Sequence, residues 1–145
     1  ALGSLNISTT AGGITQALGT RVDARGVTSL SATDGTSDFD ITLDNANNNF
    51  AGMIQVDHAA SLALGGTLLT LKNITTSGTQ TYNGPVMLAA RASVANNDVV
   101  ISGHGITFNQ EVNGANRLML TDAGDTVFTK SVGDLTLGAA PLHWS

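Results

Sequence analysis

The fold is decided by two stretches near the C-terminus, Gly105-Ile106-Thr107-Phe108-Asn109-Gln110-Glu111-Val112-Asn113-Gly114 and Asp125-Thr126-Val127-Phe128-Thr129-Lys130-Ser131-Val132-Gly133. In both, a valine follows four positions after a phenylalanine, so that Phe108 corresponds to Phe128 and Val112 to Val132 at the same offset. Self-similarity at a period of about 20–50 residues is the signature of repeat architectures, in which each unit stacks on the next. The two stretches therefore predict stacked turns of chain.

The same pattern occurs twice more upstream, in Tyr82-Asn83-Gly84-Pro85-Val86 and Phe50-Ala51-Gly52-Met53-Ile54. The intervals between the aromatic residues at positions 50, 82, 108 and 128 decrease along the chain, so the repeat is imperfect and shortens toward the C-terminus. The first half is less regular, since Gln16 stands where an aromatic residue is expected. Stacking of equivalent positions predicts two columns. One contains Phe50, Tyr82, Phe108 and Phe128, and the other contains Ile54, Val86, Val112 and Val132.

The elements predicted within each repeat are short strands. Runs of three to six residues alternate apolar and polar side chains and end at Gly, Asn or Asp, as in Phe39–Leu43 and Leu118–Thr121. The best helical candidate, Asp57–Leu64, is short and stops at Gly65-Gly66. Two or three strands with corners need about 20–25 residues, which predicts an all-β, parallel β-helix (β-solenoid) of about six or seven coils. The alternative is a β-sandwich whose repeat arises by chance among β-branched residues.

The composition suits stacking and argues against several classes of partner. Charged residues make up 12% of the chain, against about 25% in typical globular domains, and stacked Thr and Asn can form hydrogen bonds where stacked like charges repel. The net charge of −5 and the scattered basic residues argue against nucleic acid as a partner. No apolar run is long enough for a membrane-spanning helix, so no membrane insertion is expected. The absence of cysteine fits an exported protein that strand ladders and packing hold together.

Residues 1–145 are interpreted as a single β-solenoid segment, a fragment of a longer repeat protein. The chain opens with Ala1-Leu2-Gly3-Ser4, without a signal-peptide pattern, and ends with Pro141-Leu142-His143-Trp144-Ser145. Strand-like runs lie close to both ends, and an open turn of a solenoid presents unpaired backbone groups. We therefore expect neighbouring copies or flanking repeats of the same protein to pack end to end.

The segment Ser77–Leu137 resembles the repeat region of large filamentous-haemagglutinin-like exoproteins (adhesins) of Gram-negative bacteria. The stretches that carry the resemblance are Gly78–Val86, Gly105–Phe108 with Val112–Asn116, and Ala123–Phe128 with Val132-Gly133. The resemblance implies a right-handed parallel β-helix, type V-type secretion, a secreted or cell-surface location, and a role in adhesion or biofilm. It extends to the other residues only in general composition, and the N-terminal secretion domain of those proteins is not recognisable in this sequence.

One pair of aspartates is a candidate metal site. Asp122 and Asp125 bracket Gly124 in the manner of half a calcium-binding nonapeptide. A calcium roll needs this motif in tandem, because each ion lies between successive turns. The simpler interpretation of the single copy is a solvated corner.

A second acidic group is a candidate for polysaccharide chemistry. It consists of Asp34, Asp38, Asp40 and Asp44, and we expect Asp38 and Asp40 on one strand face because they are two residues apart. Enzymes of this kind pair facing carboxylates, and they also need basic and aromatic residues that hold the sugar. Only Arg25 and Phe39 lie near this group in the sequence.

No other catalytic or metal-ligating pattern is present. The three histidines, His58, His104 and His143, lack metal-ligand spacing, and the chain contains no Gly-x-Ser-x-Gly motif, cysteine nucleophile or phosphate-binding loop. Trp144 is interpreted either as the cover of an apolar core opening or as part of a turn that continues beyond the fragment, and Arg91 is interpreted as a turn residue. We therefore assign no catalytic, cofactor-binding or metal-binding residue and no cofactor.

The resulting hypothesis is a structural or adhesive repeat segment of a secreted or cell-surface bacterial exoprotein, with no catalytic activity, that serves adhesion, a filament or the biofilm matrix. Cell-surface glycans or proteins are further candidate partners. The alternative is a carbohydrate-active or glycan-binding β-helix domain. A long polar groove with paired Asp and a nearby Arg would favour an enzyme, whereas shallow Thr and Asn faces would favour a stalk.

Overall fold

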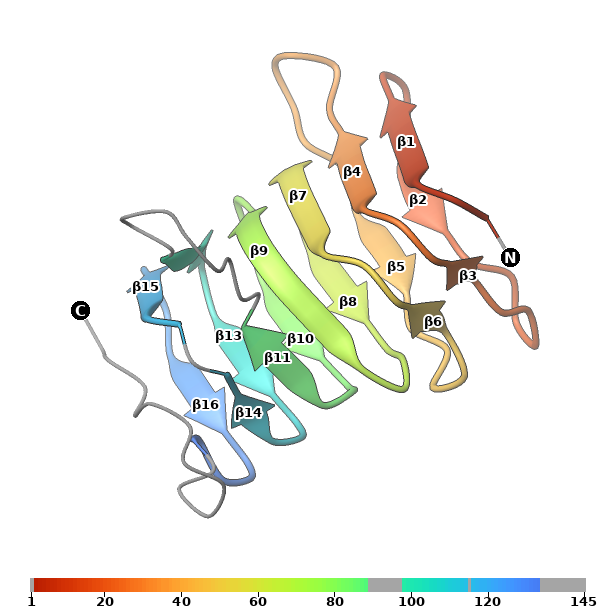
Figure 1. Ribbon diagram of the computed structural model, residues 1–145. Coiled ribbons are helices and arrows are strands. Elements are labelled where there is room, and N and C mark those ends of the chain that lie inside the picture. The colour runs from red at the N-terminus through yellow and green to blue at the C-terminus, as the bar shows by residue number, and fades with distance from the viewer. Residues whose placement is uncertain (1, 89–97, 115, 134–145) are drawn as a thin grey trace.

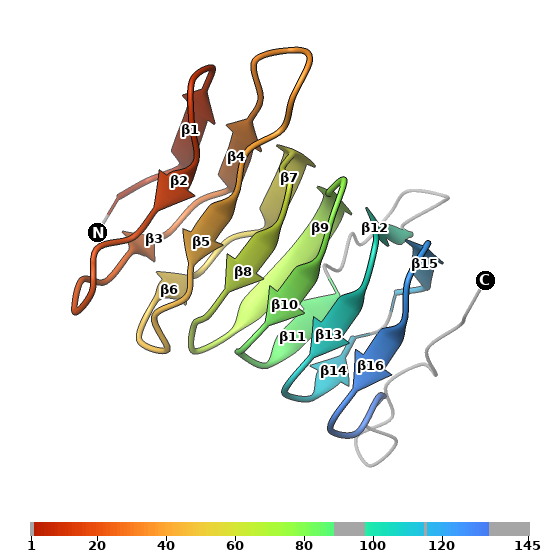
Figure 2. The same cartoon turned by 180° about the vertical axis from the view of Figure 1, so that it is seen from behind.

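The computed structural model describes residues 2–88, 98–114 and 116–133 of the chain. In this part of the chain all regular structure is β, in short strands joined by turns, and no helix occurs. Successive turns of chain stack along one axis, from β1 (Leu5–Thr9) to β16 (Thr126–Phe128), as Figures 1 and 2 show from two sides. Every pairing between named strands is parallel. The predicted all-β parallel solenoid is confirmed.

One wall of the solenoid is an eight-stranded sheet, called the long-strand sheet below. Its order is β1-β4-β7-β9-β11-β14, and β12 and β15 continue it beside β9. The long strand β9 pairs through its first half with β11 and through its second half with β12. Besides β1, the strands are β4 (Thr28–Ala32), β7 (Ile54–His58), β9 (Leu69–Thr75), β11 (Val86–Leu88), β12 (Val99–Gly103), β14 (Val112–Asn113) and β15 (Leu118–Asp122).

The opposite wall is a six-stranded sheet, called the short-strand sheet below, in the order β16-β13-β10-β8-β5-β2. Its strands besides β16 are β2 (Ile14–Thr15), β5 (Ile41–Leu43), β8 (Leu62–Leu64), β10 (Gln80–Tyr82) and β13 (Ile106–Phe108). A third, two-stranded sheet pairs β3 (Asp23–Ala24) with β6 (Asn49–Phe50).

The described solenoid has about five turns, because the six strands of the short-strand sheet are joined by five parallel pairings. This number is lower than the six or seven expected. Two of the steps between equivalent positions are longer than assumed, namely those from Ile14 to Ile41 and from Gln80 to Ile106. The first of these includes a loop that an antiparallel bridge between Thr33 and Asp38 closes.

The columns predicted for the C-terminal half are confirmed. Phe108 pairs with Phe128 in the parallel register, and an isolated parallel bridge joins Val112 to Val132. Each column extends one turn toward the N-terminus as expected, with Tyr82 on Phe108. Val86 likewise lies beside Val112. The spacing from aromatic residue to valine therefore recurs because the aromatic residue lies on one sheet and the valine on the other.

The columns predicted for the N-terminal half are wrong. Beyond Tyr82 the aromatic column continues with Leu64 and Leu43, whereas Phe50 pairs with Ala24 in the small third sheet. Ile54 pairs with Leu71, and the neighbour of Val86 is Leu69. The long interval between Phe50 and Tyr82 contains a turn that has leucine, not an aromatic ring, at the column position. Counting aromatic residues therefore missed that turn.

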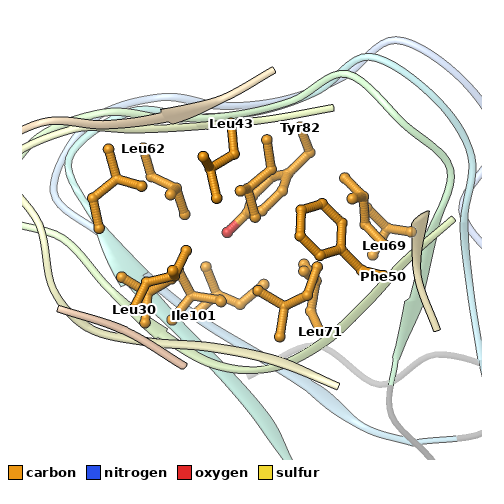
Figure 3. Packing of buried hydrophobic residues seen from close by; sticks show 14 of the residues in the cluster. Leu30, Leu43, Phe50, Leu62, Leu69, Leu71, Tyr82 and Ile101 are labelled. Carbon is orange, nitrogen blue, oxygen red and sulfur yellow. The ribbon is translucent and has the colours of Figure 1, made fainter. Parts of the chain in front are cut away.

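The core is the interior of the coil. Figure 3 shows Leu43, Leu62 and Tyr82 facing Leu30, Leu71 and Ile101 inside the ring of strands. These side chains are at most 3% exposed. Alternate residues of the strands point inward and are buried, as in the pattern buried-exposed-buried of β5. Burial of apolar surface at about 25 cal/mol per Å² is the dominant favourable contribution to folding.

Candidate functional site: the polar edges of the solenoid

The aspartates of residues 34–44 do not converge on one point. Asp38 and Asp40 precede β5, so they do not lie on a strand as predicted, and Asp38 closes the loop that begins at Thr33. Asp38 lies 3.7 Å from His58 Nδ1, and Asp40 accepts a hydrogen bond of 2.7 Å from Ser61 Oγ. Each carboxylate therefore contacts its own partner on the next turn.

Asp34 stabilises its own loop. Its Oδ1 accepts hydrogen bonds from the backbone N–H groups of Ser37 (2.7 Å) and Thr36 (2.8 Å). Both hydrogen bonds lower the pKa of the Asp34 carboxyl group below its ordinary value, and the bond from Ser37 has the larger effect. The arrangement is an Asx turn, in which the side chain mimics a backbone acceptor. Asp34 therefore stays ionised and holds the turn in place.

Asp44 begins a polar ladder along one corner of the solenoid. Asn83 Nδ2 donates to Asp44 Oδ1, and Asn109 Nδ2 donates to Asn83 Oδ1, both over 2.7 Å. The turn between Asp44 and Asn83 has Gly65 at this position, and a Cβ there would lie 2.6 Å from the Asp44 carbonyl oxygen. The missing side chain at Gly65 lets Asn83 reach across one turn to Asp44.

Asp122 joins two successive corners. Its Oδ1 accepts from the backbone N–H groups of Gly105 (2.7 Å) and Gly124 (2.8 Å), and its Oδ2 accepts from Thr126 Oγ1 (2.6 Å). Desolvation alone would raise the pKa of Asp122, but the hydrogen bonds together outweigh it and lower the pKa below its ordinary value. Both carboxylate oxygens of Asp122 therefore accept hydrogen bonds from groups of the protein.

The residues expected to support sugar chemistry lie elsewhere or are used for packing. Phe39 packs against the core, and Arg25 is exposed after β3 and forms no ion pair with the aspartates within the described residues. Glycosidic general acids need a raised pKa. The two carboxyl groups with a clear shift, Asp34 and Asp122, both have a lowered pKa. Neither Asp34 nor Asp122 therefore has the raised pKa of a glycosidic general acid.

The two histidines that the structure describes have different surroundings. His58 faces Asp38, and His104 is an exposed corner residue whose backbone N–H donates to the Gly78 carbonyl. No group of three His, Cys, Asp or Glu side chains gathers in metal-binding proximity in the described ranges. His143, Trp144 and Arg91 lie outside the described residues. The described residues contain no helix with the length and hydropathy needed to cross a membrane.

Two buried amides were not predicted from the sequence. Asn48 is fully buried and exchanges two hydrogen bonds with Gln16, of 2.7 and 2.9 Å, and its Oδ1 also accepts from the Val22 N–H. Gln80 is equally buried and accepts a hydrogen bond of 2.6 Å from the Tyr82 hydroxyl. The one available signal was that a polar residue, Gln16, stands at the column position; besides Asn48 it bonds the Thr20 carbonyl and the Asn45 N–H.

Two shallow hollows lie in the first turns. One, of about 380 Å³, is lined by Gln16, Ala17, Leu18, Gly19, Thr42, Asp44, Asn45 and Ala46. The other, of about 410 Å³, is lined by Leu2, Leu5, Ile7, Arg21, Val22 and Asp23 and lies at the N-terminal face of the coil. The first combines polar side chains with apolar ones, among them the fully exposed Leu18, and the second is mainly apolar.

Comparison with known proteins supports the repeat character. A family model described as repeats of unknown function (DUF5649) matches residues 1–57, which span β1 to most of β7. No curated protein and no solved structure matches the chain. The chain is thus a repeat protein by sequence and a β-solenoid by structure.

Proposed function

We propose that this chain is a non-catalytic structural or adhesive segment of a secreted or cell-surface bacterial exoprotein of the filamentous-haemagglutinin-like type. The observation that supports the proposal most is that the polar side chains form hydrogen bonds within the solenoid. Asp34, Asp44 and Asp122 accept hydrogen bonds that brace loops or link turns, so these carboxylates serve the solenoid itself. A stalk needs such axial links, whereas an enzyme needs carboxylates that face a substrate.

The outer surface of the short-strand sheet agrees with this proposal. Its middle positions form one row along the axis, called the threonine row. The row consists of Thr15, Thr42, Ala63, Thr81, Thr107 and Val127. Such a shallow row of small side chains is the surface expected for a stalk. Neutral hydroxyls also avoid the repulsion that stacked like charges would cause at the strand spacing.

Location is tested with antibodies raised against this chain. Cells that produce the parent protein are labelled intact and after lysis, and a second sample is treated with protease before labelling. The proposal predicts labelling of intact cells or of the culture medium, and loss of the cell-bound label after protease. Labelling that appears only after lysis would contradict an exposed or secreted stalk.

Catalysis is tested separately. The chain is incubated with a panel of polysaccharides, including uronate polymers, and new reducing ends are measured. The proposal predicts no release above that of the double variant Asp38→Asn, Asp40→Asn. Release that the wild type shows and the double variant lacks would establish the enzyme alternative.

A specific observation favours glycan binding as a second candidate function. The hollow beside Thr42, Asp44 and Asn45 combines hydrogen-bonding groups with the fully exposed Leu18, and no Lys or Arg lines it. This lining suits the hydroxyls and the apolar face of a neutral sugar better than an anionic one. Glycan-array binding that Leu18→Ala weakens and Leu68→Ala does not would support it, because Leu68 is also exposed but lies outside the hollow.

A further inference from the structure

The corner ladder of Asp44, Asn83 and Asn109 contains an asparagine that is followed by glycine, Asn83-Gly84. In such a pair the glycine backbone nitrogen can attack the asparagine side-chain carbonyl carbon, because glycine has no Cβ to hinder the approach. A bond forms between Gly84 N and Asn83 Cγ, the Cγ–Nδ2 bond breaks, and Nδ2 leaves as ammonia with the proton of the Gly84 N–H. Water then opens the resulting succinimide ring to aspartate or isoaspartate. The net reaction is the hydrolysis of a side-chain amide to a carboxylate and ammonia.

Packing requires glycine at position 84. A Cβ on Gly84 would lie 2.4 Å from the Gly66 carbonyl oxygen on the neighbouring turn, which is closer than a Cβ atom can approach without a shift of the backbone. Gly84 is buried, and its N–H donates no hydrogen bond within the described residues. The fold therefore retains this reactive pair of residues, and the attacking nitrogen has no hydrogen bond of its own to break.

The ladder holds the group that would be attacked. Asn83 Nδ2, the leaving nitrogen, donates to Asp44 Oδ1, and Asn83 Oδ1 accepts from Asn109 Nδ2, both over 2.7 Å. Rotation of the Asn83 amide toward the Gly84 nitrogen would break both hydrogen bonds. The other asparagine followed by glycine, Asn113, forms no side-chain hydrogen bond in the part of the chain that the structure describes. The ladder therefore restrains the reaction at Asn83 and has no counterpart at Asn113.

The product of the reaction does not fit the ladder. A carboxylate at position 83 has no N–H to donate, and it would face the carboxylate of Asp44 across the distance that the present hydrogen bond spans. Two like charges so close together repel each other. Once Asn83 has reacted, the link between the turns of Asp44 and Asn83 therefore cannot form again.

We propose that Asn83-Gly84 is a site of spontaneous deamidation, protected while the corner ladder is closed and reactive when this corner of the solenoid opens. Water is the co-reactant, and no enzyme is required. Each reaction adds one negative charge and converts a transient opening into a permanent loss of one link between turns. This chemistry depends on the ladder alone and not on the stalk function.

The rate test follows deamidation of the full 145-residue chain at mildly alkaline pH by peptide mapping with mass spectrometry. The rate at Asn83 should be about tenfold or more lower in the folded chain than in denaturant, because two hydrogen bonds must break before the ring can close. Asp44→Ala removes the acceptor of Asn83 Nδ2, so it should raise the folded-state rate at Asn83 and leave the rate at Asn113 unchanged. Equal rates at Asn83 in the folded chain and in denaturant would overturn the proposal. An Asp44→Ala variant that leaves Asn83 unaffected, or that accelerates Asn113 equally, would also overturn it.

A second experiment examines the product directly. Asn83→Asp imitates the deamidated chain and should lower the denaturant midpoint of unfolding. Adding Asp44→Asn should restore most of the loss, because the exchanged pair again has one N–H donor and one carboxylate acceptor. Asn113→Asp is the matched control and should lower the midpoint less, since Asn113 pairs with Met87 and not with a carboxylate. A midpoint that Asn83→Asp leaves unchanged, or a loss that Asp44→Asn does not restore, would contradict the conflict with Asp44 on which the proposal depends.

Discussion

Phe108 lies directly on Phe128, with the ring centroids 4.8 Å apart and the ring planes inclined by only 6°. Tyr82 lies on Phe108 in the same way, at 4.9 Å. Free aromatic pairs prefer offset or edge-to-face geometry. Both separations equal the spacing of neighbouring strands, about 4.7–4.9 Å. The backbone ladder therefore sets the stacking of the rings, and the column reports directly on the register of the solenoid.

Phe108→Ala should destabilise the chain by about 3–5 kcal/mol, because the ring is fully buried between two others. Denaturant unfolding followed by circular dichroism measures the change. The control is Val127→Ala, the outward neighbour of Phe128 on the same sheet, which is 44% exposed and should change stability by about 0.5 kcal/mol or less. Equal effects of the two substitutions would mean that inside and outside are assigned wrongly.

Asn48→Ala should lower stability by about 1–3 kcal/mol, because the substitution leaves the Val22 N–H and the Gly65 carbonyl without the Asn48 side chain as partner, and unpaired buried groups carry that cost. Asn47→Ala, next to it but exposed, is the matched control and should be nearly neutral. Thermal melts of both variants check the prediction, and a neutral Asn48→Ala would show that water replaces the amide.

Thr28→Val should stabilise the protein by about 1 kcal/mol or more, because replacing the hydroxyl by a methyl group of similar size removes the cost of burying it. Thr28 is fully buried in a column between Leu5 and Ile54, and its Oγ1 is the one buried side-chain polar atom without a hydrogen-bond partner in the described residues. The unfolding midpoint in denaturant measures the change, and the exposed Thr42→Val serves as the comparison. A lower midpoint for Thr28→Val would indicate an unseen partner for the hydroxyl.

Asp122 should make stability sensitive to acid. Its pKa in the folded chain lies below the ordinary value of 3.8, so its contribution is fully present above that pH and is lost as the pH falls toward the folded pKa. The difference in unfolding free energy between the wild type and Asp122→Asn should therefore be larger near neutral pH than near pH 3. Urea titrations at the two pH values measure it. Thr126→Val, which removes only the hydroxyl donor, should reproduce part of the effect. A difference that does not change with pH would contradict this role of the carboxylate.

The C-terminal half could be predicted from the sequence because its repeat is visible in large side chains. Phe108 and Phe128 occupy consecutive turns of similar construction, so one spacing gave the correct register for both sheets. The column position predicted for Phe50 was wrong because the next turn has Leu64 in the aromatic column. Nothing in the size or polarity of Leu64 distinguishes it from any other core leucine. Periodicity read from aromatic rings fails wherever an aliphatic side chain fills the same space.

The polar features were harder to predict because residue type does not reveal burial. Asn48 reads as one of several turn asparagines, yet it is fully buried and satisfied by Gln16. The corner ladder was accessible in principle, since Asn83 and Asn109 each directly follow a column aromatic. Asp38 and Asp40 were expected on a strand because the loop closed by Thr33 and Asp38 was not recognised, although Asp34-Gly35 is a turn sequence. Tertiary pairing decided each of these cases.

The central claim, that the chain climbs one strand spacing per turn, is tested most directly by distances along the threonine row. The chain has no cysteine, so pairs of spin labels can be placed at Thr15, Thr42, Thr107 and Val127 without background. Thr42 and Thr107 are three steps apart, Thr42 and Val127 four, and Thr15 and Val127 five. At about 4.8 Å per step, double electron–electron resonance should give separations that rise evenly, from roughly 14 through 19 to 24 Å before linker corrections. Separations that do not increase in this order, as antiparallel hairpins of a sandwich would produce, would contradict the solenoid.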